Sequence, residues 1–136
     1  MSMSDTQESG GTFTISCRRL EAAETVALHA AGYTGDGFVI ALTGELDLAT
    51  VPVAEEELRR AEASHDLIVL DLRRLTFIDS TGLRLMISAD GRAHERGAAL
   101  VIVEGPPQVR RLFDLSGIAG HLKVIEDILA EVAPAE

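Results

Sequence analysis

The sequence predicts an α/β fold in which helices pack against a single mixed β-sheet. Two short, continuous apolar runs, residues 67–70 and 99–103, have the pattern of strands that are buried on both faces of a sheet. Amphipathic helical patterns alternate with these runs, as in units whose parallel strands are joined by right-handed crossovers. The length of 136 residues suits one domain.

The N-terminal residues 1–24 are expected to be an extension, and the domain itself is expected to span residues 25–133. Residues 1–11 are polar and rich in Ser and Gly, which is typical of a flexible arm. The stretch that follows leaves two interpretations open. Phe13 and Ile15 alternate as in a short strand, whereas the residues after them could be helical.

A β-hairpin is expected next. Residues 25–30 show a modest alternation, and residues 38–42 form a strong strand pattern that Gly44 ends. The residues between the two strands supply turn chemistry: Gly32, Gly35, Asp36 and Gly37.

A helix is expected after residue 50. Thr50 can cap this helix, and Pro52 is tolerated in its first turn. Apolar residues at helical spacing are expected to form its buried face: Val51, Ala54, Leu58 and Ala61. The charged residues, which lie mostly opposite, are expected to be solvated: Glu55, Glu56, Glu57, Arg59 and Arg60.

Two further helices, a strand and a last helix complete the predicted order β-β-α-β-α-β-α-β-α. The helix from Ser80 to Arg96 is closed by Gly97 as its C-cap. The next helix buries Val109, Leu112 and Phe113 and stops near Gly117. A strand over residues 122–124 precedes a final helix over residues 126–132, whose expected inward side chains are Ile128, Leu129 and Val132.

Composition excludes several classes of function. Acidic residues outnumber basic ones by 22 to 12, and the net charge of −10 argues against nonspecific nucleic-acid binding and against docking on an anionic membrane. The N-terminus lacks the basic and apolar runs of a signal peptide, and no segment is apolar enough to span a membrane. Cys17 is the single cysteine, so neither an internal disulfide nor a zinc site is expected. We expect a cytoplasmic monomer without a cofactor.

The segment from residue 67 to residue 85 leads from a buried strand through a short loop into a helix that starts at Asp79-Ser80-Thr81-Gly82. Ser80 has the residue type of a helix cap. Gly82 costs about 1 kcal/mol relative to Ala in a helix, but its lack of a side chain could let another surface approach. A phosphate on Ser80 would meet the free N–H groups of the helix start and add about −1.5 to −2 charges beside Asp79. The pattern indicates either an ordinary helix start or a binding surface that phosphorylation switches.

The enzyme interpretations are weaker. The nucleophile-elbow pattern Gly-x-Ser-x-Gly is not met, because Ile78 stands where its first glycine would be. Gly105-Pro106-Pro107 lacks the ending of a phosphate-binding loop. The four histidines have no spacing that indicates a site: His29, His65, His94 and His121. We therefore interpret Ser80 as a substrate of a kinase and expect no enzyme.

Three stretches, in order, resemble STAS-domain anti-sigma-factor antagonists. Phe77-Ile-Asp-Ser-Thr-Gly-Leu resembles the phosphorylation loop of that family. Leu42-Thr-Gly-Glu-Leu-Asp resembles the loop that follows an early strand. Val109-Arg-Arg-Leu-Phe-Asp-Leu-Ser-Gly-Ile resembles the penultimate helix and its turn. The resemblance covers roughly residues 25–133.

The resemblance implies a regulatory binding protein. In its unphosphorylated form, such a protein binds an anti-sigma factor that is also a serine/threonine kinase, and a sigma factor is set free. The kinase phosphorylates the serine that matches Ser80, which releases the antagonist, and a metal-dependent serine phosphatase restores it. Thr81 is a second candidate acceptor, because related stressosome proteins use Thr. Asp47 either contacts the partner or positions the loop, or it is an acid that favours a helix start. The expected partner-binding residues are Asp47, Asp79, Ser80, Thr81, Gly82 and Arg84.

Two other functions stay open. The domain could be a scaffold with fixed contacts, in a stressosome-like assembly or as the cytoplasmic partner of a lipid or anion transporter. A small hydrolase that uses Ser80 is the least favoured interpretation.

Overall fold

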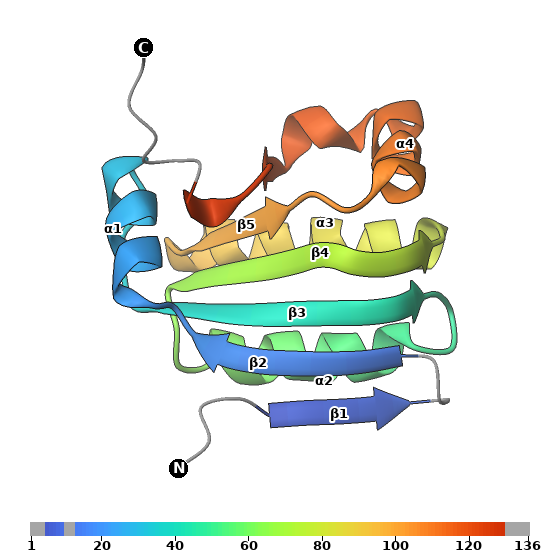
Figure 1. Cartoon of the computed structure of the whole chain (residues 1–136), viewed down its shortest axis with the longest axis horizontal. Helices are drawn as coiled ribbons and strands as arrows, with labels where there is room; N and C mark the ends of the chain where they lie inside the picture. The colour runs from blue at the N-terminus through green and yellow to red at the C-terminus, as the bar shows by residue number, and fades with distance from the viewer. Residues whose placement is uncertain (1–4, 10–12, 130–136) are drawn as a thin grey trace.

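The computed structural model describes residues 5–9 and 13–129, which form a six-stranded mixed sheet in the order β1-β2-β3-β4-β5-β6 (Figure 1). Strands β1, β2 and β3 pair antiparallel, and the pairs from β3 to β6 are parallel. The predicted mixed α/β fold is confirmed.

The elements are β1 (Asp5–Ser9), β2 (Phe13–Arg19), α1 (Ala22–Ala30), β3 (Gly37–Leu46), α2 (Val51–Glu62), β4 (Leu67–Ile78), α3 (Ser80–Arg96), β5 (Ala99–Val103), α4 (Pro107–Ser116), the 3-10 helix η1 (Ile118–His121) and β6 (Lys123–Ile125).

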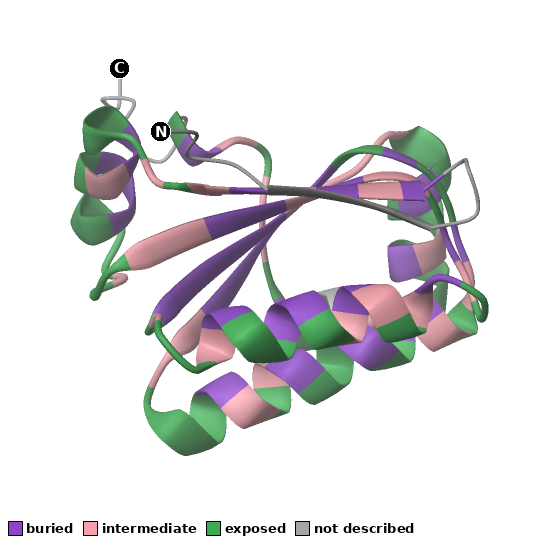
Figure 2. Ribbon diagram, turned by 90° about the horizontal axis from the view of Figure 1, so that it is seen from below, coloured by how far each residue is buried: buried purple, intermediate pink, exposed green. Residues whose placement is uncertain are grey.

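The sheet has a hydrophobic core on each face. Helices α2 and α3 lie side by side under one face, and α1 lies on the other (Figure 2). Leu70 and Ile102 belong to the core under α2 and α3, whereas Val69 and Val101 belong to the core under α1. The two apolar runs are therefore strands buried on both faces, as their sequences predict.

The predicted hairpin is wrong. The antiparallel partner of β3 is β2, with Arg19 opposite Phe38, and residues 25–30 lie in α1. A reciprocal capping box between Glu21 and Glu24 starts this helix. Both interpretations left open for this stretch hold in part, because the strand ends at Arg19 and the helix follows.

The described part of the N-terminal arm is a strand. Residues 5–9 form β1, which pairs with β2 along its whole length. Phe13 and Ile15 of β2 are fully buried in the core. The folded core thus includes residues upstream of the expected domain start at residue 25.

Helix α2 buries Ala54, Leu58 and Ala61 as predicted, whereas Val51 is only half-buried. Two further expectations for this helix are not met. Thr50 does not cap the helix with its side chain; its hydroxyl donates to the carbonyl of Glu45 at 2.8 Å. Glu57 is only 6% exposed rather than solvated, because its carboxylate turns inward and pairs with Arg60 at 2.6 Å.

The C-terminal half follows the sequence pattern in part: α4 buries Val109 and Phe113 as predicted, whereas Leu112 is half-buried. Helices α3 and α4 end at Gly97 and Gly117, both of which have positive φ. The last strand, β6, begins one residue later than predicted. Ile128 is buried as expected, but Leu129 is 47% exposed. The expected helix over 126–132 is wrong at its start, because Glu126 lies in a bend and Asp127 has no regular structure. Residues 130–132, including Val132, lie outside the described residues.

Candidate functional site

The loops after β3 and β4 lie side by side at one end of the sheet. The two strands are parallel and end in register, with Leu46 opposite Ile78. The N–H of Asp79 donates to the carbonyl of Leu46 at 3.2 Å and ties the two loops together. The topology therefore brings the stretches around Asp47 and Ser80, 33 residues apart in sequence, to one edge.

Asp79, not Ser80, caps helix α3. Asp79 has an extended backbone, and its carboxylate accepts hydrogen bonds from the N–H groups of Thr81 at 2.9 Å and of Gly82 at 3.2 Å. The Thr81 hydroxyl donates to the same carboxylate oxygen. Ser80 is the first residue of the helix rather than its cap, and it is exposed.

The hydrogen bonds to Asp79 keep its carboxylate charged. Partial burial acts to raise the pKa of Asp79, but donors outweigh it: the Thr81 hydroxyl and the backbone N–H groups of Gly82, Thr81 and Leu48. The net result is a pKa of Asp79 below its usual range. A fixed negative charge therefore stands next to Ser80 at neutral pH.

The two candidate acceptor hydroxyls differ in availability. The Ser80 side chain is exposed and makes no hydrogen bond within the described part of the chain. Thr81 is half-buried, and its hydroxyl is bonded to Asp79. Ser80 thus presents the hydroxyl that another protein can reach.

Gly82 is buried against the protein's own core. A Cβ atom at this position would lie 2.7 Å from Cγ1 of Ile78 and 3.0 Å from the Leu46 side chain. The room that the sequence suggested for an approaching surface is therefore filled from inside. The absence of a side chain lets the start of α3 lie close to the ends of β3 and β4.

Asp47 closes the turn into α2. Its carboxylate accepts hydrogen bonds from the N–H groups of Ala49 at 3.0 Å and Thr50 at 3.2 Å. This geometry agrees with the interpretation of Asp47 as an acid at a helix start. It also fixes the loop that carries Leu48 beside Asp79.

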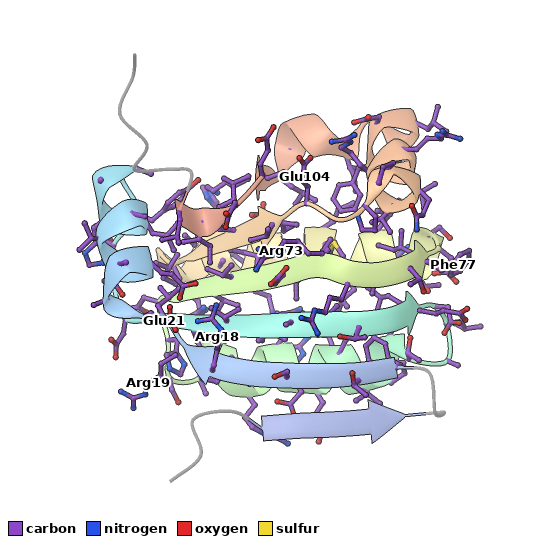
Figure 3. All side chains as sticks on the ribbon, viewed as in Figure 1. Arg18, Arg19, Glu21, Arg73, Phe77 and Glu104 are labelled. Atoms are coloured by element: carbon purple, nitrogen blue, oxygen red, sulfur yellow. The ribbon has the colours of Figure 1, made fainter. Side chains whose placement is uncertain are left out.

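Two exposed apolar side chains, which we call the apolar rim, lie at the two strand ends that meet near Ser80. Leu48 in the β3–α2 loop is 73% exposed, and Phe77 near the end of β4 is 47% exposed. Figure 3 shows Phe77 at this end of β4, where the chain turns into α3. Sequence analysis missed both residues, although an apolar Leu48 among the polar residues of a loop is a usable indication of a contact surface.

A protein-family model and related proteins match this chain. The family model, whose description is "Mlab, STAS domain", matches residues 29–129. The anti-sigma-B factor antagonist of Staphylococcus epidermidis is 34% identical over 93 residues, which are 67% of this chain and 85% of that protein. The chain belongs to the STAS-domain family of anti-sigma-factor antagonists. The anti-sigma F factor antagonist of Paenibacillus polymyxa is 32% identical over 84 residues, 59% of this chain and 70% of that protein.

Solved structures share the STAS fold. The anti-sigma factor antagonist from Mycobacterium paratuberculosis has a TM-score of 0.63 at 19% identity, over 87% of this chain and 91% of that one. Unphosphorylated SpoIIAA has a TM-score of 0.61 at 22% identity, over 84% of this chain and 91% of that one. SpoIIAA from Bacillus in its phosphorylated form has a TM-score of 0.55 at 20% identity, over 84% of this chain and 95% of that one.

Two histidines of this STAS domain lie near the starts of β3 and β4, whereas Ser80 follows the end of β4. His65 stacks on Phe38 with ring centroids 4.5 Å apart, near the starts of β3 and β4, and His29 contacts the carbonyl of Gly35 at 3.3 Å in the same region. Within residues 5–9 and 13–129, no group of three or more His, Cys, Asp or Glu side chains could hold a metal ion. In the same part of the chain, no helix is long and apolar enough to cross a membrane.

Proposed function

We propose that this STAS domain is an anti-sigma-factor antagonist whose binding to an anti-sigma factor kinase is switched by phosphorylation of Ser80. The observation that carries the proposal is the exposed, unbonded hydroxyl of Ser80 beside the charged carboxylate of Asp79. The names of the related proteins support the role as an antagonist. The protein acts in the cytoplasm as a monomer.

The unphosphorylated protein binds the kinase through the surface around Ser80. Binding buries the apolar surface of the rim, and removing this surface from water favours association. Polar groups surround the rim and set the register of the contact: Asp47, Asp79, Ser80, Thr81 and Arg84. Because Asp47 and Asp79 are already held by their own loops, little ordering is needed on binding. The sigma factor is released when this contact forms.

Phosphorylation requires only that the kinase reach Ser80. The Ser80 oxygen attacks the γ-phosphorus of ATP bound to the kinase, a new O–P bond forms, and the bond from the γ-phosphorus to the β,γ-bridging oxygen breaks to release ADP. The hydroxyl proton passes to a base of the kinase. A metal-dependent serine phosphatase reverses the step by transferring the phosphoryl group to water, which returns Ser80 and inorganic phosphate.

The phosphate weakens binding by charge and by desolvation. It adds about −1.5 to −2 charges at neutral pH, next to the ionised Asp79 and at the same end of the sheet as the apolar rim. A dianion in an apolar contact is costly unless the partner pairs it. The fold itself accommodates the group, because Ser80 is exposed.

A second candidate is a scaffold with fixed contacts, in a stressosome-like assembly or beside a lipid or anion transporter. One feature favours it: the cap at Asp79 and the apolar rim form a complete surface without any modification. In that case the same residues bind a permanent partner, and phosphorylation has no role.

The switch is tested with three variants of the full chain, each used to capture its partner from the native cells. Ser80→Ala should retain an anti-sigma factor that phosphorylates the unsubstituted protein from ATP, and Ser80→Asp should lose it. Ser88→Ala, at an exposed position of α3 outside the proposed contact, is the control. A Ser80→Asp protein that binds this kinase as tightly as the parent would contradict the charge switch and favour the scaffold.

A further inference from the structure

The start of α3 leaves few backbone donors for a phosphate. The N–H groups of Thr81 and Gly82 are bound by the carboxylate of Asp79, and the N–H of Leu83 donates to the Asp79 carbonyl at 3.2 Å. The expectation from sequence, that a phosphate on Ser80 would meet free N–H groups, is therefore wrong for these three donors. The counter-charge for the phosphate has to come from a side chain.

Arg84 stands one helical turn after Ser80. Residues four apart in a helix lie on the same face, with Cβ atoms about 5–6 Å from each other. Both side chains are exposed on α3. An acid at the first position and a base at the fourth after it is also the favourable order, because it agrees with the helix dipole.

Arg84 is the uncommitted arginine of α3. Arg92 pairs with Glu62 at 2.8 Å, and Arg96 lies 3.9 Å from Asp66. Within the described residues Arg84 makes neither an ion pair nor a side-chain hydrogen bond. Its guanidinium is free to turn toward the helix start without breaking an existing contact.

We propose that Arg84 is the intramolecular counter-ion of a phosphate on Ser80; the presence of that phosphate rests on the proposed function. Two N–H groups of the guanidinium donate to two phosphate oxygens in a bidentate pair. The pair offsets the repulsion between the phosphate and Asp79. It also draws Arg84 away from the partner surface, so that one modification adds negative charge and removes a positive group from the contact.

The pair is tested by phosphorus NMR on the full chain with phosphoserine installed at position 80 during translation. Arg84 should lower the second pKa of the phosphate, because it stabilises the dianion. We expect this pKa to rise by about 0.3 unit in Arg84→Ala, as for a pair of this spacing. The difference should shrink at 1 M salt.

Arg19→Ala is the matched control. Arg19 is an exposed arginine at the end of β2, far from Phe77 and the start of α3 (Figure 3), and its removal changes the net charge equally. The control should keep the pKa of the parent protein. The proposal is overturned if Arg84→Ala leaves the pKa unchanged, or if both variants shift it equally.

The outcome is independent of any kinase, because the phosphate is installed during translation. Absence of phosphate on Ser80 in cells would contradict the proposed function without altering the NMR result. An unchanged pKa in Arg84→Ala would contradict the ion pair and leave the proposed function standing.

Discussion

The carboxylate of Asp79 accepts hydrogen bonds from both the backbone N–H and the hydroxyl of Thr81. Thr81 is therefore part of the helix cap, whereas Ser80 is not. We predict that Thr81→Ala lowers the free energy of unfolding by about 0.5–1.5 kcal/mol, the usual net contribution of such a bond. Ser80→Ala, the matched control, should change it by less than about 0.5 kcal/mol. Urea unfolding of both variants measures the difference, and equal effects would contradict the assigned cap.

The charge on Asp79 should appear in the pH dependence of stability. The pKa of Asp79 is lower in the folded protein than in the unfolded chain, where it is about 3.9. The charge therefore contributes stability fully above that value and loses it as the pH falls through the lower, folded pKa. We expect the parent protein to lose more stability than Asp79→Asn below about pH 4.

The same position separates capping from charge. At pH 7, Asp79→Ala should cost about 1 kcal/mol, because the first-turn N–H groups lose their acceptor. Asp79→Asn keeps an acceptor and should cost less. Urea titrations at several pH values test both statements. If the free energy of unfolding falls equally at low pH for the parent and for Asp79→Asn, the result would count against an ionised cap.

Two glycines of α3 should respond to alanine in opposite directions. At Gly82 the new Cβ would overlap Ile78 and press on Leu46, so we expect a net loss of about 1 kcal/mol despite the better helix propensity. At Gly91 nothing lies within 4 Å of the new atom, and we expect a gain of up to about 1 kcal/mol. Thermal or urea unfolding of the two variants measures both changes in the free energy of unfolding. Stabilisation by Gly82→Ala would contradict the close packing at the start of α3.

The apolar rim should affect binding more than folding. Leu48→Ser should change the free energy of unfolding by less than about 0.5 kcal/mol, because this side chain is exposed. Phe77→Ser should cost about 1 kcal/mol, because roughly half of this side chain is buried. Each should weaken binding of the unphosphorylated protein to its kinase by about tenfold or more. Val26→Ser, on α1 at the other end of the sheet, is the control and should leave affinity unchanged. Calorimetry measures the affinities. Equal affinities for all variants would contradict the claim that the apolar rim contacts the kinase.

The sequence predicted the parts of the fold that local patterns determine. Continuous apolar runs indicated β4 and β5, and Gly97 and Gly117 marked the ends of α3 and α4. The hairpin failed because the alternation of residues 25–30 is weak, and the true partner of β3 precedes α1. That arrangement depends on pairing between residues far apart in sequence, such as Thr14 of β2 opposite Thr43 of β3.

The site was predicted in outline, and its details depend on neighbours that are distant in sequence. The motif pointed to residues 79–82, but both Asp and Ser are capping residues, and helix starts are uncertain by one or two positions. The role of Gly82 depends on Leu46, which another strand supplies. An apolar Leu48 in a loop is a local indication of a contact surface, but no local pattern brings that loop next to the start of α3; the hydrogen bond from Asp79 to Leu46 does so.

Phosphopeptide mass spectrometry on protein from its native cells tests the central claim most directly. Trypsin releases the peptide Leu75–Arg84, which contains Thr76, Ser80 and Thr81, and fragmentation separates the three positions. The phospho-switch predicts phosphate on Ser80, in a fraction that changes between growth and stress. A peptide that stays unmodified under all conditions, or that carries phosphate only on Thr81, would contradict it.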